Sequence, residues 1–516
     1  MTSGRRPLFR NCLRRTGKMS YFTFTAIKSL YVGKQKGYGK CGVAVIRISG
    51  PEASMALKKM AKVRNLEPRR AVLRKIRDPR TEEVLDKGLC LWFPGPSSFT
   101  GEDSVEFHVH GGPAVVSSLL QALSKLNFNL AAPGEFTKRA FFNGKLDLTE
   151  AEGIGDLIEA ETEKQRKQAS RQADGSLRRL YDHWRENLLM SFASLETFVD
   201  FSEENPVGND IMKNTRLSFE QLSREIQRHL MDGKRGEVLR NGIRMVIVGE
   251  PNAGKSSLLN ILSKKDTAIV TSMPGTTRDI VEITIDVSGY PVILADTAGI
   301  RNNPENEAEV EGIRRARTTA EKADIVLCLV NGENGIISID NYFKELGIEK
   351  IEDTKVLVVV NKIDLIQQEE KELWQNRKLV GISCKTNEGI EELTRRLGED
   401  FKELCGDPSE ENPLISHERY RNHLTRCVDH VNSFLEQTEG EYYDVAISLQ
   451  EIRSAARELG KITGHIGNEE VLDIIFKHFF HKTNNLRIKK LTQKQLKRIN
   501  IQTSNLRSRN IYIMLV

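Results

Sequence analysis

One short run constrains the fold of this chain more than any other feature, namely Gly249-Glu-Pro-Asn-Ala-Gly-Lys-Ser-Ser257. It has the form G-x-x-x-x-G-K-S, follows the apolar segment 243–248 and precedes the helical pattern 258–262. Between a strand and a helix, the backbone N–H groups of such a loop close around phosphates, its lysine reaches the β- and γ-phosphates, and its serine ligates Mg²⁺. The predicted phosphate-binding residues are Gly249, Asn252, Ala253, Gly254, Lys255, Ser256 and Ser257.

Three further motifs follow apolar runs that indicate buried strands. Asp296-Thr-Ala-Gly299 follows 292–295, Asn361-Lys-Ile-Asp364 follows 356–360, and Ser383-Cys-Lys385 follows 379–382. The carboxylate of the first motif can hold the Mg²⁺ shell, and its glycine can contact the γ-phosphate. The Asp that ends the second motif can accept two N–H groups of a guanine edge, which adenine does not offer. The predicted nucleotide contacts are Asp296, Thr297, Ala298, Gly299, Asn361, Lys362, Asp364, Ser383, Cys384 and Lys385.

Four motifs in this order resemble those of the small GTPases, so we expect a Ras-like domain that binds GTP rather than ATP. Such enzymes follow the D-T-A-G motif with a glutamine that orients water, but here Ile300 stands in that place. An aliphatic side chain cannot orient or deprotonate water, so another group must do so. The residues alone leave the glutamates of the acidic segment 301–311 open as candidates, among them Glu307, Glu309 and Glu311.

The segment 271–279 is the candidate for the loop that senses the γ-phosphate. Its Thr277 is placed to ligate Mg²⁺ when GTP is bound. Neighbouring threonines and backbone carbonyls, with Asn252 of the phosphate-binding loop, can wrap a monovalent cation against the phosphates.

The charge of the chain is divided unevenly along it. Residues 1–40 hold ten Lys or Arg and residues 481–516 hold nine, both without any acidic residue, which leaves the rest at 58 basic against 71 acidic. A net charge of +6 therefore predicts no broad nucleic-acid-binding surface on the globular body. The Arg-rich, acid-poor opening predicts a mitochondrial transit segment; a basic leader without a targeting role is the alternative.

Three classes of protein are argued against by composition. The seven cysteines lie far apart, which argues against a disulfide scaffold and against a zinc module. No apolar stretch approaches the length of a membrane span.

The motifs P-N-A-G-K-S-S-L-L-N, P-G-T-T-R-D, D-T-A-G-I-R and N-K-I-D together resemble the MnmE (TrmE) tRNA-modification GTPases. Flanking runs agree, among them Gly42–Gly50, Phe93–Asp103 and Ala132–Leu148 upstream and Val471–Phe476 downstream. The basic leader suggests the mitochondrial, eukaryotic member, working in the matrix.

The resemblance implies a multidomain α/β fold. It would have an N-terminal α+β folate-type domain and an α-helical bundle domain, with a Ras-like P-loop GTPase domain inserted into the bundle. Helical periodicity on both sides of the GTPase motifs is consistent with that insertion. The expected boundaries are 1–20 for the transit segment, 21–145 for the N-terminal dimerisation and folate-binding domain, 146–240 and 405–480 for the two helical parts, 241–404 for the GTPase domain and 481–516 for a basic tail.

The resemblance also assigns residues. A formyl-tetrahydrofolate or related one-carbon folate would be bound by Arg47, Glu106 and Lys145. Mg²⁺ would be held by Ser256 and Thr277, and K⁺ by Asn252, Thr271, Thr276 and the carbonyl of Met273. Among the carboxylates left open above, the resemblance selects Glu309, so that the expected catalytic residues are Glu309 and Thr277.

The function implied is K⁺-stimulated GTP hydrolysis by a homodimer that, with a MnmG-like FAD protein, modifies C5 of the tRNA wobble uridine U34. One departure bears on this expectation: the family ends in Phe-Cys-Ile-Gly-Lys, whereas here Phe479 is followed by Phe480-His-Lys. A regulatory GTP switch, or an isoform that cannot carry out the modification, is therefore the alternative.

Overall fold

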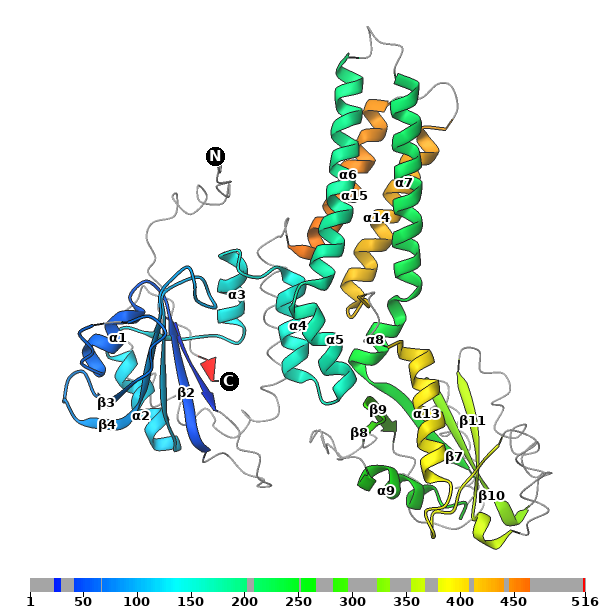
Figure 1. The fold of residues 1–516 in the computed structure, drawn as a ribbon, viewed down its shortest axis with the longest axis horizontal. Helices are drawn as coiled ribbons and strands as arrows, with labels where there is room; N and C mark the ends of the chain where they lie inside the picture. The colour runs from blue at the N-terminus through cyan, green and yellow to red at the C-terminus, as the bar shows by residue number, and fades with distance from the viewer. Residues whose placement is uncertain are drawn as a thin grey trace, which may run out of the picture. The chain divides into compact units, whose positions relative to one another are not determined.

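The computed structural model describes residues 23–28, 41–65, 67–201, 208–249, 252–265, 282–295, 323–334, 354–366, 379–407, 413–439, 445–464 and 514–515. The chain divides into two units, 1–151 with 467–516, and 152–466 (Figure 1). Each unit is described by itself.

The first unit is built on a mainly antiparallel sheet. Its described strands are β1 (Thr23–Lys28), β2 (Cys41–Ser49), β3 (Val72–Arg77), β4 (Val84–Phe93), β5 (Ser104–Gly111), β6 (Asn129–Leu130) and β13 (Met514–Leu515). The order is β13-β1-β2-β5-β4-β3, with β6 beside β1. Helices α1 (Ala53–Met60) and α2 (Pro113–Ser124) contact the sheet, and α3 (Glu135–Phe142) follows β6.

Side chains alternate between the two faces of this sheet, as a period of two requires. In β2, Ala44, Ile46 and Ile48 are fully buried against the residues of α1 and α2, while Arg47 between them points to the other face. In β5, Phe107 is likewise in the core, and Glu106 lies directly across from Arg47 in the register of the two strands. The polar face opposite the helices therefore carries the candidate folate-binding residues of β2 and β5.

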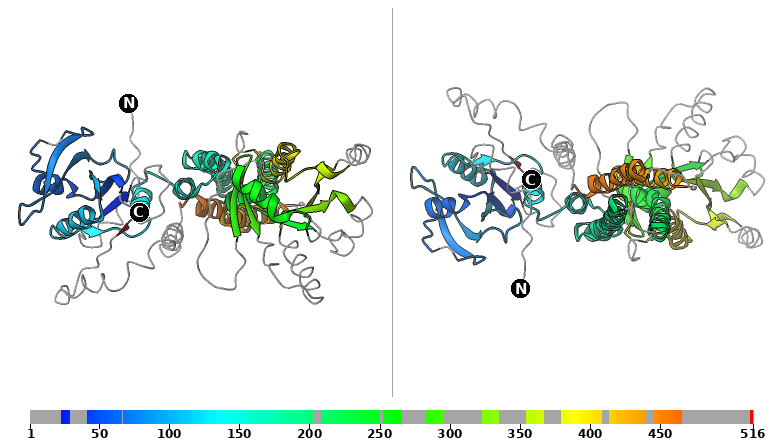
Figure 2. Two further views of the ribbon diagram at one scale, coloured as in Figure 1. Left: turned by 90° about the horizontal axis from the view of Figure 1, so that it is seen from below. Right: turned by 90° about the horizontal axis from the view of Figure 1, so that it is seen from above.

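The second unit contains a helical bundle. Its helices are α4 (Leu148–Glu159), which begins in the first unit, α5 (Glu163–Ala173), α6 (Ser176–Phe201), α7 (Gly208–Met231), α8 (Gly233–Asn241), α14 (Glu418–Gln437) and α15 (Val445–Thr463). The long helices α6, α7, α14 and α15 pack side by side (Figures 1 and 2). Their shared core includes fully buried aromatic side chains, among them Tyr181, Phe219, Tyr420 and Phe434. No helix in the described ranges is both long and apolar enough to cross a membrane.

A second sheet lies between α8 and α14 in the chain. Its strands are β7 (Ile243–Gly249), β8 (Glu282–Val287), β9 (Tyr290–Ala295), β10 (Ile325–Asn331), β11 (Lys355–Asn361) and β12 (Val380–Gly381). The order is β12-β11-β10-β7-β9-β8, and every pair is parallel except β8 with β9. Helices α9 (Lys255–Lys265) and α13 (Ile390–Cys405) pack on it, with short 3₁₀ helices η3 (Gly332–Asn334) and η5 (Ile363–Leu365) after β10 and β11.

The apolar runs read from the sequence are strands of this second sheet. Segment 243–248 lies in β7, 292–295 in β9, 356–360 in β11, and the last run contains β12. Parallel strands buried on both faces are continuous in Val, Ile and Leu, which is why these runs could be recognised. The predicted fold class, with a Ras-like domain within a helical domain and an α+β domain before it, is confirmed.

Candidate functional site

The phosphate-binding loop follows β7 and ends at the first turn of α9. Its backbone has positive φ at Asn252 (63°) and Gly254 (98°). A Cβ on Gly254 would lie 2.2 Å from Nδ2 of Asn361, so only glycine fits at that position. The ammonium of Lys255 donates to the carbonyl of Gly249 at 2.7 Å, which holds it over the loop. The described part of the loop, residues 252–254, thus has the positive-φ backbone that a phosphate-binding loop uses at such turns.

Asn361 connects this loop to the opposite side of the site. Its Nδ2 donates to the carbonyl of Ala253 at 2.7 Å, and its Oδ1 accepts from the backbone N–H of Cys384 at 3.1 Å. The side chain is 2% exposed. A single buried amide therefore fixes the phosphate-binding loop relative to the loop that follows β12.

The motifs predicted to hold the base lie at the ends of β11 and β12. Asp364 is in η5, after Lys362, which has a φ of 66° and pairs with Glu333 at 3.3 Å. Buried Ser383 orders its own turn, because its Oγ accepts from the backbone N–H groups of Lys385 and Thr386 at 3.3 and 3.2 Å. Burial raises the pKa of the Cys384 thiol, against the effect of its contact with Asn361. The thiol is therefore kept neutral at physiological pH.

Several predicted site residues lie outside the described residues, so the structure does not test them. They are Thr271, Met273, Thr276, Thr277, Asp296, Thr297, Ala298, Gly299 and the three carboxylates Glu307, Glu309 and Glu311.

The described part of the loop fits the Mg²⁺ that GTP would bring. Ser256 is the second residue of α9, directly after Lys255, and it is exposed, so that its hydroxyl oxygen is accessible to a metal ion. Within the described ranges, no three His, Cys, Asp or Glu side chains lie close enough together to hold a metal ion by themselves.

The candidate folate-binding residues Arg47 and Glu106 lie together on the first unit's sheet. Arg47 Nε is 2.8 Å from Glu106 Oε1, and His108 Nε2 is 3.1 Å from the other carboxylate oxygen. The Arg47 guanidinium also lies over the ring of Phe99, at 5.7 Å, and over that of Phe136, at 6.0 Å. A cation, a carboxylate, an imidazole and two rings thus form one cluster, which suits a planar, polar ligand.

Lys145 is exposed and lies beside Gly101, in the loop before β5. A Cβ added to Gly101 would be 3.3 Å from the Cγ of Lys145. Sequence reasoning missed the remaining groups of the cluster, namely His108, Phe99 and Phe136. The signal for His108 was available, because residues two apart in a strand share a face and His108 follows Glu106 by two. Phe99 and Phe136 lie in other segments, so no local pattern joins them to Arg47.

Comparison with known proteins extends these findings over most of the chain. Two family models match, the MnmE helical domain over residues 148–479 and the GTP-binding protein TrmE N-terminus over residues 33–145. The chain is 43% identical to the mitochondrial 5-taurinomethyluridine tRNA synthase subunit GTPB3 of Danio rerio, over 86% of this chain and 91% of that one. It is also 43% identical to the Homo sapiens protein of the same name, with the same coverage.

The tRNA modification GTPase MnmE of Parvibaculum lavamentivorans is likewise 43% identical, over 86% of this chain and 97% of that protein. The phosphate-binding loop, the parallel sheet and these matches define a P-loop GTPase, which hydrolyses GTP to GDP and phosphate. More narrowly, the chain belongs to the MnmE (TrmE) family. The resemblance read from the motifs is thereby confirmed.

Proposed function

We propose that this GTPase takes part in the C5 modification of the wobble uridine U34 in mitochondrial tRNAs. The observation that carries the proposal is the agreement of the chain, along 86% of its length, with relatives that are named as mitochondrial tRNA synthase subunits or tRNA modification GTPases. It is supported by a nucleotide site in which the phosphate-binding and base-binding loops are joined by one buried amide.

In this proposal the chain's own residues bind and orient GTP. Lys255 and the backbone of the loop hold the phosphates, and Asp364 accepts from the guanine edge. Ser256 and Thr277 would hold Mg²⁺, which neutralises phosphate charge when bound. Glu309 acts on the attacking water, directly or through a bridging water, with Glu307 and Glu311 as the alternatives.

A monovalent cation completes the proposed mechanism. K⁺ held by Asn252, Thr271, Thr276 and the carbonyl of Met273 would offset charge that develops between the β- and γ-phosphates, as an arginine finger does in other GTPases. Of these residues, Asn252 is described, and its φ of 63° lies in the left-handed region.

The proposed partners are tRNA, a MnmG-like FAD protein and a second copy of this chain. A one-carbon folate such as 5-formyl-tetrahydrofolate would bind at Arg47, Glu106 and Lys145. Because Arg47 is paired with Glu106 here, a glutamyl carboxylate of the folate must compete with Glu106 for the guanidinium. Closure of the GTPase domains on GTP would gate the chemistry.

A second candidate function is favoured by a specific observation. Phe479 is followed by Phe480-His-Lys, whereas the family has Phe-Cys-Ile-Gly-Lys, so Phe480 stands at the position of the cysteine associated with the modification. A regulatory GTP switch, or an isoform that cannot carry out the modification, needs only the GTP motifs.

Potassium should stimulate steady-state GTP hydrolysis by about tenfold or more relative to sodium at matched ionic strength. The reason is that K⁺ would supply the positive charge that an arginine finger supplies in other GTPases, and the smaller Na⁺ fits the same oxygen ligands less well. Phosphate release measured in the two buffers checks this. Equal rates would mean that no cation site forms around Asn252, and the switch function would then be preferred.

Cells that lack this chain should accumulate mitochondrial tRNAs with an unmodified U34. Mass spectrometry of the tRNA nucleosides measures the loss. The wild-type chain should restore the modification, whereas Lys255→Ala, which removes the phosphate-binding ammonium, should not. Normal modification in the deleted cells would contradict the proposed function and leave the GTPase activity in place.

A further inference from the structure

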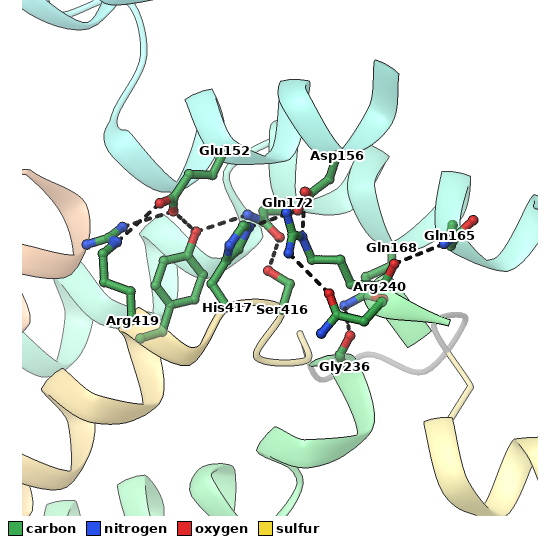
Figure 3. Close-up of polar contacts among 12 residues, drawn as sticks. Glu152, Asp156, Gln165, Gln168, Gln172, Gly236, Arg240, Ser416, His417 and Arg419 are labelled. Atoms are coloured by element: carbon green, nitrogen blue, oxygen red, sulfur yellow. Dashed lines mark hydrogen bonds and ion pairs between the residues drawn. The ribbon is translucent and has the colours of Figure 1, made fainter. Parts of the chain in front are cut away.

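Asp156 of α4 binds both chain segments that join the GTPase sheet to the helical bundle. Its Oδ1 accepts from Arg240 Nε at 2.7 Å, and its Oδ2 is 3.0 Å from His417 Nε2 (Figure 3). Arg240 is in the last turn of α8, which leads through Gly242 into β7. His417 directly precedes α14, on the return from the sheet. One carboxylate thus holds the two connections of the inserted domain.

Helix α5 adds contacts to the same two connections and to the GTPase sheet itself. Gln165 Nε2 donates to the carbonyl of Arg240 at 3.0 Å, and Gln168 Nε2 to that of Gly236 at 3.3 Å. Lys164 reaches the sheet, since its backbone N–H donates to the carbonyl of Gly289 at 3.1 Å, between β8 and β9. Its ammonium pairs with Asp407 at 3.0 Å.

The two connections also touch each other directly. A Cβ on Gly236 of α8 would lie 2.2 Å from the carbonyl oxygen of Ile415, so the backbones meet at that glycine. Helices α4 and α5 therefore hold a closely packed pair of segments rather than two separate linkers. Movement of one connection must displace the other.

A second buried carboxylate continues the network to the end of α15. Glu152 of α4 accepts from Arg419 Nη2 at 2.9 Å and from the hydroxyl of Tyr420. Arg419 in turn donates to the carbonyls of Lys461 and Ile462, at 2.9 and 3.1 Å, in the last turn of α15. Gln172 closes the network, since it donates to Tyr420 at 3.1 Å and accepts from Ser416 at 2.7 Å.

These buried charges are better suited to fixing geometry than to adding stability. Burial alone would raise the pKa of Asp156, but its contacts with His417 and Arg240 outweigh burial and lower that pKa. The carboxylate therefore stays ionised and keeps both partners. Buried ion pairs are often no more stabilising than well-packed apolar side chains, but in several proteins buried polar groups specify a single arrangement.

We infer that Asp156 is a positioning residue for GTP hydrolysis, which fixes the orientation of the GTPase domain on the helical bundle through Arg240 and His417. The strand β7 runs from this anchor to the phosphate-binding loop and is buried along most of its length. The position of the first residue of β7 relative to the helical bundle therefore affects the position of the phosphate-binding loop at the other end of the strand. The inference rests on GTP hydrolysis alone and needs no tRNA.

The test compares Asp156→Asn with the wild-type chain in three measurements. They are kcat for GTP in K⁺ buffer, the affinity for a fluorescent GDP analogue, and the distance distribution between spin labels introduced as noncanonical amino acids at exposed Leu217 and Glu391. We expect kcat to fall by about tenfold, GDP affinity to stay within about twofold, and the distribution to broaden. Lys164→Gln, at a less buried position, should also lower kcat and broaden the distance distribution. It takes the place of Asp156→Asn in the test if that variant does not fold.

The matched control is Asp78→Asn in the first unit. The side chain of Asp78 is 8% exposed, against 9% for Asp156, and it pairs with Lys125 at 2.6 Å, but it contacts neither connection. The Asp78→Asn variant should have the kcat and the distance distribution of the wild-type chain. A lower melting temperature in Asp156→Asn, with kcat and distribution width as in the wild type, would show that the network only stabilises and would overturn the inference. An equal fall in kcat and GDP affinity would overturn it too, because the nucleotide site itself would then be disturbed.

Discussion

Asp364→Asn should change the chain from a guanine-nucleotide enzyme to a xanthine-nucleotide enzyme. A carboxylate accepts both N–H groups of the guanine edge, whereas an amide presents one donor and one acceptor, which match xanthine. Asp364 is held in η5 directly after β11, and an amide has the same shape as a carboxylate, so the pocket keeps its shape when the charge is lost. Sites that hydrogen-bond a ligand edge reject the mismatched edge by about a thousandfold or more.

The measurement is competition of GDP and XDP for a bound fluorescent nucleotide, in the wild type and in Asp364→Asn. Asp400→Asn is the control, because Asp400 pairs with Lys355 at 2.7 Å in the same domain and lies on α13. The control should retain the preference for GDP. If Asp364→Asn also retained it, Asp364 would not be the residue that reads the base.

The nucleotide site was predictable because each of its motifs follows a strand. Continuous runs of Val, Ile and Leu marked β7, β9 and β11, and parallel strands bring their carboxyl ends to one edge of a sheet. The phosphate-binding loop and the N-K-I-D motif therefore had to be neighbours. Sequence order and strand direction were sufficient for that inference.

Contacts that depend on register or on long-range packing were not predictable. The pair Arg47–Glu106 arises from the register of β2 against β5, and no short hairpin joins these strands to fix that register. In α4, helical periodicity indicated a core face and gave no sign that Glu152 and Asp156 bind segments from α8 and α14. A buried carboxylate is recognised only when its partners are seen, because isolated acids in a helix are usually solvated.

The role of Asn361 as a link between two loops was likewise not predictable from the sequence. The sequence placed it in the base-binding motif, but the structure shows that it binds the phosphate loop through Ala253 and the last loop through Cys384. Those two hydrogen bonds set the distance between the phosphate end and the base end of the site. Because these hydrogen bonds already order the two loops, nucleotide binding does not have to bear the entropic cost of ordering them.

Asn361→Ala should lower GDP affinity by about a hundredfold. The carbonyl of Ala253 and the N–H of Cys384 lose their partner at a buried position, and each unsatisfied group costs about 1–3 kcal/mol. In the free protein the two loops can relax towards water, so that nucleotide must reassemble them. A total of about 3 kcal/mol in the binding free energy corresponds to that hundredfold change. Equilibrium titration with a fluorescent GDP analogue measures it.

The matched control is Asn331→Ala. Asn331 ends β10 in register with Asn361 at the end of β11, but its amide donates to the exposed Glu333 at 3.1 Å. The same deletion one strand away should change GDP affinity by no more than about twofold, because water replaces the lost contact. Comparable losses in both variants would mean that any polar group at this edge serves equally. A loss confined to Asn361→Ala, with the melting temperature of the free protein little changed, would locate the cost in assembly of the nucleotide site.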